Sequence, residues 1–262
     1  MSSVLSKLHS YCSASIALGS ANVTGFPFLP KKPTHLFPYN RENYNQFIVW
    51  LDRIDLPDAK LILDVGANHG DFAGAASAVF PDASIWLFEP LPELHGELRL
   101  RSQVHKNRWK IFPHALGSEK AILQLHIDPE HDDIASLVGF NDSYLENNPK
   151  SENLKQGSCE VIPLDDYFEN FSERGIDLMK IDVEGFEFEV MKGATKALKQ
   201  TRALIIEVSL VRAGNRDGSR LVRMLELLES SGLIPMEIIP SWFSKNEPWL
   251  PLEFNILARR SN

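Results

Sequence analysis

Two stretches of this chain place residues that can do chemistry at the ends of buried strands. Residues 61–70 read L-I-L-D-V-G-A-N-H-G, an apolar strand followed by two glycines four positions apart. Residues 85–90 form a second apolar strand that ends on Glu89. A glycine loop lets backbone approach a ligand closely, and a carboxylate at the tip of the next strand can hold the two hydroxyls of a ribose. Together the two stretches predict a site for an adenosine-containing cofactor.

The residues of the glycine loop indicate which cofactor. A dinucleotide pyrophosphate is held by G-x-G-x-x-G at a helix N-terminus, but this loop is Gly66-x-x-x-Gly70, and the glycine that would complete the dinucleotide pattern is missing. Asp64 would repel a pyrophosphate and instead suits the ammonium and sulfonium of S-adenosylmethionine. The string D-x-G-x-N-x-G is similar to the first motif of class I S-adenosylmethionine-dependent methyltransferases. The alternative, a packing turn in a doubly wound protein, leaves Glu89 without a role.

A second group of acidic residues follows the strand predicted at 177–183. Asp182 and Glu184 stand two residues apart and face the same way if the strand persists. Glu207 lies within the next predicted strand, at 203–208. In open α/β sheets ligands bind at the carboxyl ends of the strands, so these side chains are expected to share one rim. The expected rim consists of Asp64, Glu89, Asp182, Glu184 and Glu207.

Strands and helices alternate over most of the chain, which predicts an α/β fold. The strands are nearly continuous apolar runs, as expected for a doubly wound, mostly parallel sheet covered on both faces. No helix separates the last two strands, at 234–239 and 254–258, so they should form an antiparallel C-terminal hairpin. The other expected strands are 61–65, 84–88 and 109–112, and the expected helices include 93–104, a helix with Val190, Met191, Ala194, Ala197 and Leu198 on one side, and a helix with Leu221, Met224, Leu225 and Leu228 on one face.

Composition limits the classes of function. The 262 residues are 44% hydrophobic and 24% charged, enough for one large domain with a core. The net charge of −8 offers no basic surface for nucleic acid. Cys12 and Cys159 form no motif, which fits a reducing, cytoplasmic location. No apolar run approaches the roughly 18 residues of a membrane span, and the apolar stretch at 14–18 is too short for a signal peptide.

Short stretches spread over residues 61 to 208 match the motifs of one known family. They are D-V-G-A-N-x-G at 64–70, F-E-P at 88–90, H-A-L-G at 114–117, L-D-D-Y at 164–167, K-I-D-V-E-G-x-E at 180–187, M-K-G at 191–193 and I-E-V at 206–208. On these stretches the chain resembles the FkbM family of methyltransferases. The first sixty residues and the region around Trp242 and Trp249 lie outside the resemblance. It implies a Rossmann-like class I methyltransferase fold, an S-adenosyl-L-methionine cofactor and methyl transfer, commonly to an oxygen of a sugar or natural product.

The resemblance also implies roles for individual residues. The loop would hold the methionine part of the cofactor, Glu89 the ribose, and residues 114–116 would lie near the adenine. Asp182 and Glu184 are the expected catalytic residues, one as general base or as the group that orients the acceptor hydroxyl. The expected cofactor-binding residues are Asp64, Gly66, Ala67, Asn68, Gly70, Glu89, Pro90, His114, Ala115, Leu116 and Asp182.

Two parts of the expected architecture surround this site. Residues 1–60 should be an N-terminal arm, proline-rich at 22–40, with a helix at 43–54 that packs on the core. Residues 61–262 should form the methyltransferase domain, with an insertion at about 120–163. Long insertions at the carboxyl side of a parallel sheet are often lids or substrate loops; a surface insertion without a role is the alternative. The aromatic segment with Trp242, Phe243, Pro248 and Trp249 could border the acceptor or plug the hairpin.

Several alternatives stay open at this point. His69, His126 and His131 are competing bases. Asp182, Glu184 and Glu207 are hard oxygen ligands of the kind that hold magnesium, so a metal-assisted O-methyltransferase is one variant, although no metal ligand is assigned. An N-methyltransferase on a small molecule is another variant. A nicotinamide oxidoreductase is disfavoured by the glycine spacing, and a catalytically inactive cofactor-binding scaffold by the retained carboxylates. The partner is expected to be a small-molecule or glycan acceptor, with the oligomeric state open.

Overall fold

The computed structural model describes residues 41–106, 108–130, 134–148, 151, 153–167, 175–211 and 219–260. The predicted N-terminal arm, the proline-rich stretch at 22–40 and His131 lie outside these residues. The predicted helix at 43–54 is present as α2, Arg41–Ile54. No helix in the described ranges is both long enough and apolar enough to cross a membrane.

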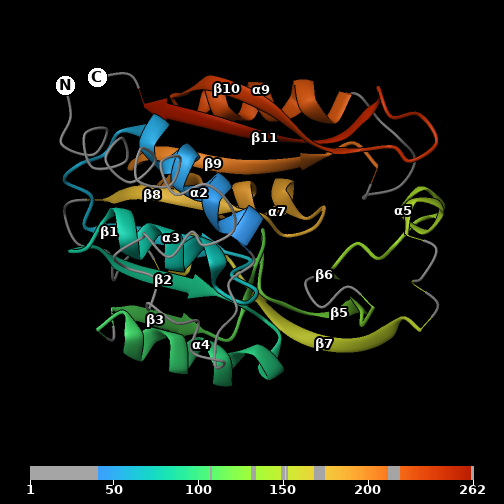
Figure 1. Ribbon diagram of the computed structural model, residues 1–262, viewed down its shortest axis with the longest axis horizontal. Coiled ribbons are helices and arrows are strands. Elements are labelled where there is room, and N and C mark those ends of the chain that lie inside the picture. The colour runs from blue at the N-terminus through green and yellow to red at the C-terminus, as the bar shows by residue number, and fades with distance from the viewer. Residues whose placement is uncertain are drawn as a thin grey trace, which may run out of the picture.

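The centre of the fold is a seven-stranded sheet in the order β10-β11-β9-β8-β1-β2-β3 (Figure 1). Five strands run parallel, and β11 pairs antiparallel with both β9 and β10. The predicted doubly wound sheet with an antiparallel C-terminal hairpin is therefore confirmed. The strands are β1 Leu61–Val65, β2 Ser84–Phe88, β3 Trp109–Phe112, β8 Ile176–Ile181, β9 Thr201–Ser209, β10 Leu233–Phe243 and β11 Pro251–Arg260.

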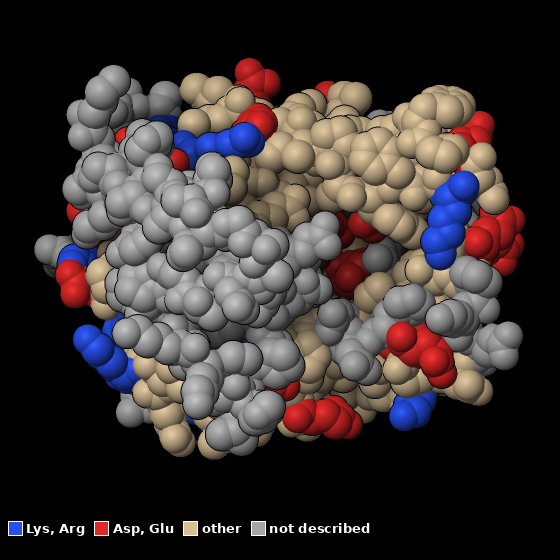
Figure 2. All heavy atoms as spheres, in the orientation of Figure 1, with Lys and Arg blue, Asp and Glu red and all other residues tan. Residues whose placement is uncertain are grey.

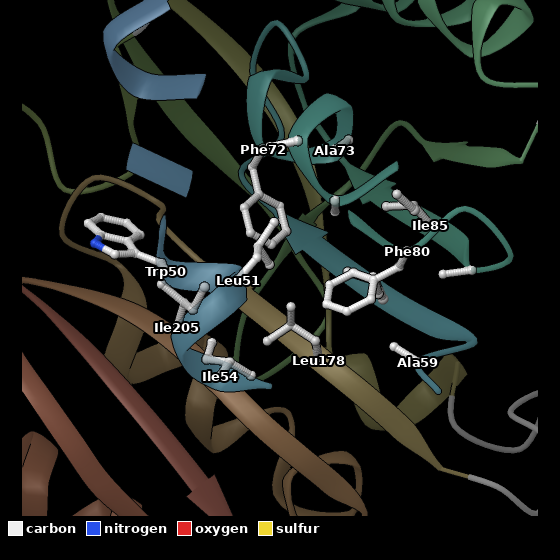
Figure 3. Packing of buried hydrophobic residues seen from close by; sticks show 14 of the residues in the cluster. Trp50, Leu51, Ile54, Ala59, Phe72, Ala73, Phe80, Ile85, Leu178 and Ile205 are labelled. Carbon is white, nitrogen blue, oxygen red and sulfur yellow. The ribbon is translucent and has the colours of Figure 1, made fainter. Parts of the chain in front are cut away.

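Helices cover both faces of this sheet because successive strand residues point to opposite sides. In β1, Ile62 belongs to the core on one face and Leu63 to the core on the other. Figure 3 shows the first core, where Trp50 and Leu51 of α2 pack with Phe72 of α3 against the sheet. This face carries α2, α3 Asp71–Val79 and α4 Pro92–Val104; the other carries α6 Leu164–Tyr167, α7 Glu187–Lys192, α8 Thr195–Lys199 and α9 Ser219–Ser230.

The single helix expected around residues 190–198 was wrong. Two short helices, α7 and α8, take its place, with Gly193 as the C-cap of α7. A Cβ at Gly193 would lie 1.8 Å from the carbonyl oxygen of Gly117. The chain must pass this backbone closely, which breaks the helix although the apolar spacing on both sides continues.

Most of the insertion expected at about 120–163, together with β4 just before it, forms a second sheet with the order β4-β7-β5-β6. Its strands are β4 Ala115–Leu116, β5 Ala121–Asp128, β6 Ile134–Ser136 and β7 Lys155–Ile162, and it carries α5 Asp142–Asn147. Residues 128–158 are mostly polar and rich in turn-forming residues, yet β6 and the first half of β7 fall within them. Both segments pair antiparallel with β5, and Ala135 of β6 packs with Leu125 of β5 in a small apolar cluster.

Side-chain contacts join the insertion to the segment after β9 and to the C-terminal hairpin. Asn141 donates a hydrogen bond to the carbonyl of Val211 after β9, and the amide of Lys245 donates to Asn147 Oδ1 at 2.9 Å. Within the insertion, the Tyr144 hydroxyl donates to the buried carboxylate of Asp128 at 2.8 Å. The part of the insertion around α5 is therefore attached to the main domain at the segment after β9 and at the turn between β10 and β11.

Candidate functional site

A pocket lies at the carboxyl ends of β1, β2 and β8, where the sequence places its acidic residues. Figure 2 shows acidic side chains on the floor of a hollow in this part of the molecule. Four carboxylates line the pocket, against one lysine and one histidine: Asp71, Glu89, Asp182, Glu184, Lys180 and His69. The remaining wall is mostly apolar and comes from α2, the glycine loop, the second sheet and the turn after β8. Its members include Phe47, Ala67, Phe72, Leu91, Ala115, Leu116, Leu125, Ala135, Leu137 and Phe186.

The glycine loop folds tightly against the end of β8. Gly66 has φ 76°, in the left-handed region that favours glycine. A Cβ on Gly66 would lie only 1.9 Å from the carbonyl oxygen of Asp182. Gly70 also has a positive φ, and its Cβ would meet Leu98 and Trp109 at 2.9 and 3.0 Å. The first glycine therefore lets the loop touch the second acidic motif, and the other lets α3 pack on α4 and β3.

The backbone amides of this loop donate hydrogen bonds to acceptors within the protein. Those of Gly66 and Ala67 both donate to the Phe88 carbonyl, at 3.0 and 3.2 Å. The Asn68 amide donates to Glu89 Oε2 at 2.7 Å, the His69 amide to the Asn68 side chain, and the Gly70 amide to the Ala67 carbonyl. A phosphate-binding loop instead points its amides at the anion. This loop therefore does not fit a pyrophosphate, in agreement with its acidic surroundings.

Glu89 stands at the tip of β2 and is 4% exposed. Its Oε2 accepts from the Asn68 amide, and its Oε1 accepts from the Leu91 amide at 2.9 Å. Burial raises the pKa of this carboxyl, although the two amide hydrogen bonds favour its charged form. A carboxylate oxygen has two lone pairs, so each Glu89 oxygen keeps one acceptor position. Two acceptor positions on one carboxylate that lines the pocket suit the two neighbouring hydroxyls of a ribose.

Lys180 of β8 lies between the loop and the acidic turn. Its Nζ is 3.1 Å from Asp182 Oδ2, 3.1 Å from the Gly66 carbonyl oxygen and 3.6 Å from Asp64 Oδ1. Burial opposes the charged ammonium, but the carboxylates of Asp182 and Asp64 outweigh that effect and raise the pKa of Lys180. Asp64 has no exposed surface, and burial raises its pKa to about 7. Asp182 reaches the pocket wall, with 31% of its side chain exposed.

The turn after β8 begins earlier than expected. The strand ends at Ile181, whereas the sequence predicted a strand to residue 183. Glu184 has φ 57°, and Glu187 accepts hydrogen bonds from the amides of Val183 and Gly185. Ser136 of β6 donates to the Glu184 carbonyl at 2.7 Å. Asp182 and Glu184 both line the pocket, through this turn rather than through a continued strand.

Most of the residues named from the sequence meet at this pocket. Asp64, Gly70 and His114 are not among its lining residues. His114 Nδ1 bonds the Tyr167 hydroxyl at 2.7 Å, and its Nε2 lies 3.4 Å from Glu160. Those that do line the pocket are Gly66, Ala67, Asn68, Glu89, Pro90, Ala115, Leu116, Asp182 and Glu184.

Lys180 and much of the apolar wall, including Ala135 and Leu137, had no assigned role in the sequence interpretation. Lys180 precedes Asp182 by two residues, so strand periodicity alone could have placed it on the same side. Ala135 and Leu137 have no such signal, because they reach the pocket only through the pairing of β5 and β6.

The candidate histidines separate in space. His69 lines the pocket, and its Nδ1 is 2.9 Å from Glu97 of α4. The almost fully buried Arg101 in turn contacts Glu97 at 2.6 Å and Asp71 at 3.0 Å. His126 of β5 packs near Gly139 and is not among the pocket's lining residues.

Three carboxylates converge beside the pocket, but in a different combination from the one expected. Ligand oxygens of Glu184, Glu207 and Glu253 lie within 4.8 Å of one another. Asp182, which the sequence grouped with Glu184 and Glu207, contacts Lys180 instead. The aromatic segment of the hairpin lies apart from the pocket lining: Trp242 is 6.4 Å from Tyr144 between ring centroids, and Trp249 is 73% exposed.

The strand order, the antiparallel hairpin and the pocket at the carboxyl ends of β1, β2 and β8 define a class I methyltransferase fold. The model of the methyltransferase FkbM domain matches residues 64–233, and the chain belongs to this family. The resemblance read from the sequence is thereby confirmed, and the protein is a methyltransferase.

Three curated relatives are 25–27% identical to the chain over the aligned residues. The 2-O-methyltransferase NoeI of Sinorhizobium fredii is 27% identical, over 68% of this chain and 72% of its own length. The hexuronic acid methyltransferase AglP of Haloferax volcanii is 26% identical, over 56% of this chain and 55% of its own length. The 31-O-demethyl-FK506 methyltransferase FkbM of Streptomyces tacrolimicus is 25% identical, over 59% and 67%.

Proposed function

We propose that this chain is an S-adenosylmethionine-dependent O-methyltransferase that acts on a hydroxyl of a sugar or natural-product intermediate. The observation that carries the proposal is the acidic pocket, which Glu89, Asp182 and Glu184 line together with a glycine loop whose amides are already hydrogen-bonded. The names of NoeI and FkbM describe transfer to oxygen, and that of AglP a sugar acid, which supports this class of acceptor.

The residues present fit the cofactor. The two free acceptor positions of Glu89 would bind the ribose hydroxyls, and the apolar side chains of Leu91, Ala115 and Leu116 would contact the adenine. The loop from Gly66 to Asn68 would hold the methionine part, whose ammonium suits a wall rich in carboxylates. When bound, the cofactor supplies a methyl group that is already activated by its sulfonium.

The remaining work falls to the chain's own side chains. They must align the acceptor oxygen and receive its proton. Asp182 and Glu184 lie on the pocket wall at the end of β8 and are the proposed groups for both tasks. His69, whose Nδ1 contacts Glu97, is the competing base that lines the same pocket.

A labelled-methyl transfer screen tests the proposal. The acceptors are sugars, glycosylated intermediates and small hydroxylated or amino metabolites, so that an N-methyltransferase is detected by the same assay. Asp182→Asn and Glu184→Gln are compared with the unchanged protein, with S-adenosylhomocysteine affinity measured for each by calorimetry. Loss of turnover with retained affinity is expected for at least one of them. Normal turnover in both would remove the assignment, and binding without transfer to any acceptor would favour the inactive scaffold.

Metal assistance is a second candidate mechanism. It is favoured by the convergence of Glu184, Glu207 and Glu253 within 4.8 Å, because carboxylate oxygens are the ligands that Mg²⁺ takes. Turnover that survives a chelator would exclude this variant, and restoration by Mg²⁺ after chelation would support it.

A further inference from the structure

We infer that Lys180 is a positioning residue that joins the cofactor loop to the catalytic turn by holding the Gly66 carbonyl and the Asp182 carboxylate together. The inference rests on the proposed function. It assigns a task to a lysine that lines the pocket wall and that has no role in the mechanism described above.

The arrangement follows from strand register. Lys180 pairs with Asp64 across the parallel strands β8 and β1, so their side chains leave the sheet on the same side. Asp182 follows Lys180 by two residues, and the Asp182 amide donates to the Val65 carbonyl, which keeps the start of the turn beside β1. Gly66 follows β1 directly. The ammonium thus stands where the ends of two neighbouring strands diverge into their loops.

The distances divide the three oxygen contacts into two kinds. The Gly66 carbonyl and Asp182 Oδ2 are both 3.1 Å from Nζ, within hydrogen-bond range, whereas Asp64 Oδ1 is 3.6 Å away. Neither side-chain oxygen of Asp64 has a hydrogen-bond partner among the described residues. Asp64 therefore acts as a counter-charge beneath the lysine, while the directed bonds of the ammonium go to the loop and the turn.

Burial makes this arrangement rigid. Lys180 is 6% exposed and Asp64 is fully buried, so the ammonium cannot leave for solvent without uncovering an unpaired buried carboxylate. Asp182 is the most exposed member, and its contact with the ammonium is what restricts its rotamers. Because the buried carboxylate of Asp64 holds the ammonium of Lys180 in place, the ammonium can in turn hold the more exposed carboxylate of Asp182.

A pair of variants separates positioning from simple charge balance. Lys180→Met alone would leave Asp64 buried without a cation and so destabilise the fold. The test therefore uses Asp64→Asn as the reference and Asp64→Asn/Lys180→Met as the probe. Both variants lack the buried carboxylate, and only the probe lacks the ammonium. Thermal unfolding first establishes that the two have similar stability.

Three measurements follow on these two proteins. The turnover number of the probe should fall about 100-fold below that of the reference, the size of effect produced by a misplaced catalytic group. Its affinity for S-adenosylhomocysteine should fall by about 2- to 10-fold, as for the loss of one hydrogen bond. Amide hydrogen exchange without any ligand should accelerate in residues 66–69 and 182–185 together.

The outcomes are distinct from those that test the proposed function. Equal turnover, affinity and exchange in the two variants would overturn the positioning role and leave Lys180 as a counter-charge only. An unchanged protein that transfers no methyl group would refute the proposed function instead. In that case affinity and exchange still decide the role of Lys180, because faster exchange in only one of the two segments contradicts a link between them.

Discussion

Gly66→Ala is the substitution whose cost can be derived most directly from the structure. The added Cβ would lie 1.9 Å from the Asp182 carbonyl oxygen and 2.9 Å from its carbonyl carbon. Cβ atoms essentially never approach other atoms within 3.0 Å, so loop and turn must separate by about 1.1 Å, the difference between 3.0 and 1.9 Å. The left-handed φ of 76° adds about 1–2 kcal/mol for a residue with a side chain, and overpacking typically adds about 1–3 kcal/mol.

The expected loss is therefore about 2–5 kcal/mol of unfolding free energy, together with weaker binding of S-adenosylhomocysteine, because the loop is a pocket wall. Urea denaturation and calorimetry measure the two effects. Gly96→Ala is the matched control: Gly96 lies within α4, its added Cβ meets nothing within 4 Å, and the change should stabilise the helix by about 1 kcal/mol. A Gly66→Ala protein with unchanged stability and affinity would refute the idea that the loop and the turn are in backbone contact.

Three further predictions follow from side chains in and around the site. Glu89→Gln should weaken S-adenosylhomocysteine binding about 10- to 100-fold, the loss expected when hydrogen bonds to a charged acceptor become neutral, and unchanged affinity in calorimetry would remove Glu89 from the ribose site. Burial, together with the neighbouring arginines, lowers the pKa of His105 to about 4. The imidazole of His105 therefore takes up a proton more readily in the unfolded chain than in the folded one. Because of this difference, the free energy of unfolding should fall as the pH drops from about 6.5 to 4. His105→Phe keeps a ring against Trp109 and should remove about 1–2 kcal/mol of that pH dependence, after allowance for partial exposure; identical pH profiles of urea denaturation would contradict it. Tyr144→Phe deprives the buried Asp128 of a donor and should cost about 1–3 kcal/mol in the same denaturation assay, while a neutral effect would mean that the insertion does not depend on this contact.

The fold could be predicted from the sequence because its signals are local. The runs at 61–65 and 84–88 are apolar, short and bounded by turn residues, and the structure gives strands with those bounds. Where a strand or helix ends for a non-local reason, the prediction was wrong. Residue 183 is a valine and continues the apolar pattern, yet the strand stops at Ile181, and Gly193 breaks a helix because of a backbone that lies 76 residues away in the sequence.

The residues of the candidate site also divide into those that local sequence signals could place and those that they could not. Strand ends in a parallel sheet meet at one edge, so Glu89 and Asp182 could be placed together from their positions alone. Lys180 was within reach of the same reasoning, since it shares a strand face with Asp182. The contribution of Ala135 and Leu137 was not, because it depends on the pairing of a polar segment with β5.

The bonded amides of the glycine loop also affect which cellular molecules can compete for the pocket. ATP and the nicotinamide dinucleotides carry the same adenine and ribose that Glu89 and the apolar wall are proposed to recognise. Their phosphates would meet a loop whose amides already donate hydrogen bonds within the protein, and a pocket lined by four carboxylates. ATP and the nicotinamide dinucleotides should therefore be poor inhibitors of this enzyme, and the cationic cofactor would not have to outcompete them by affinity for adenosine alone.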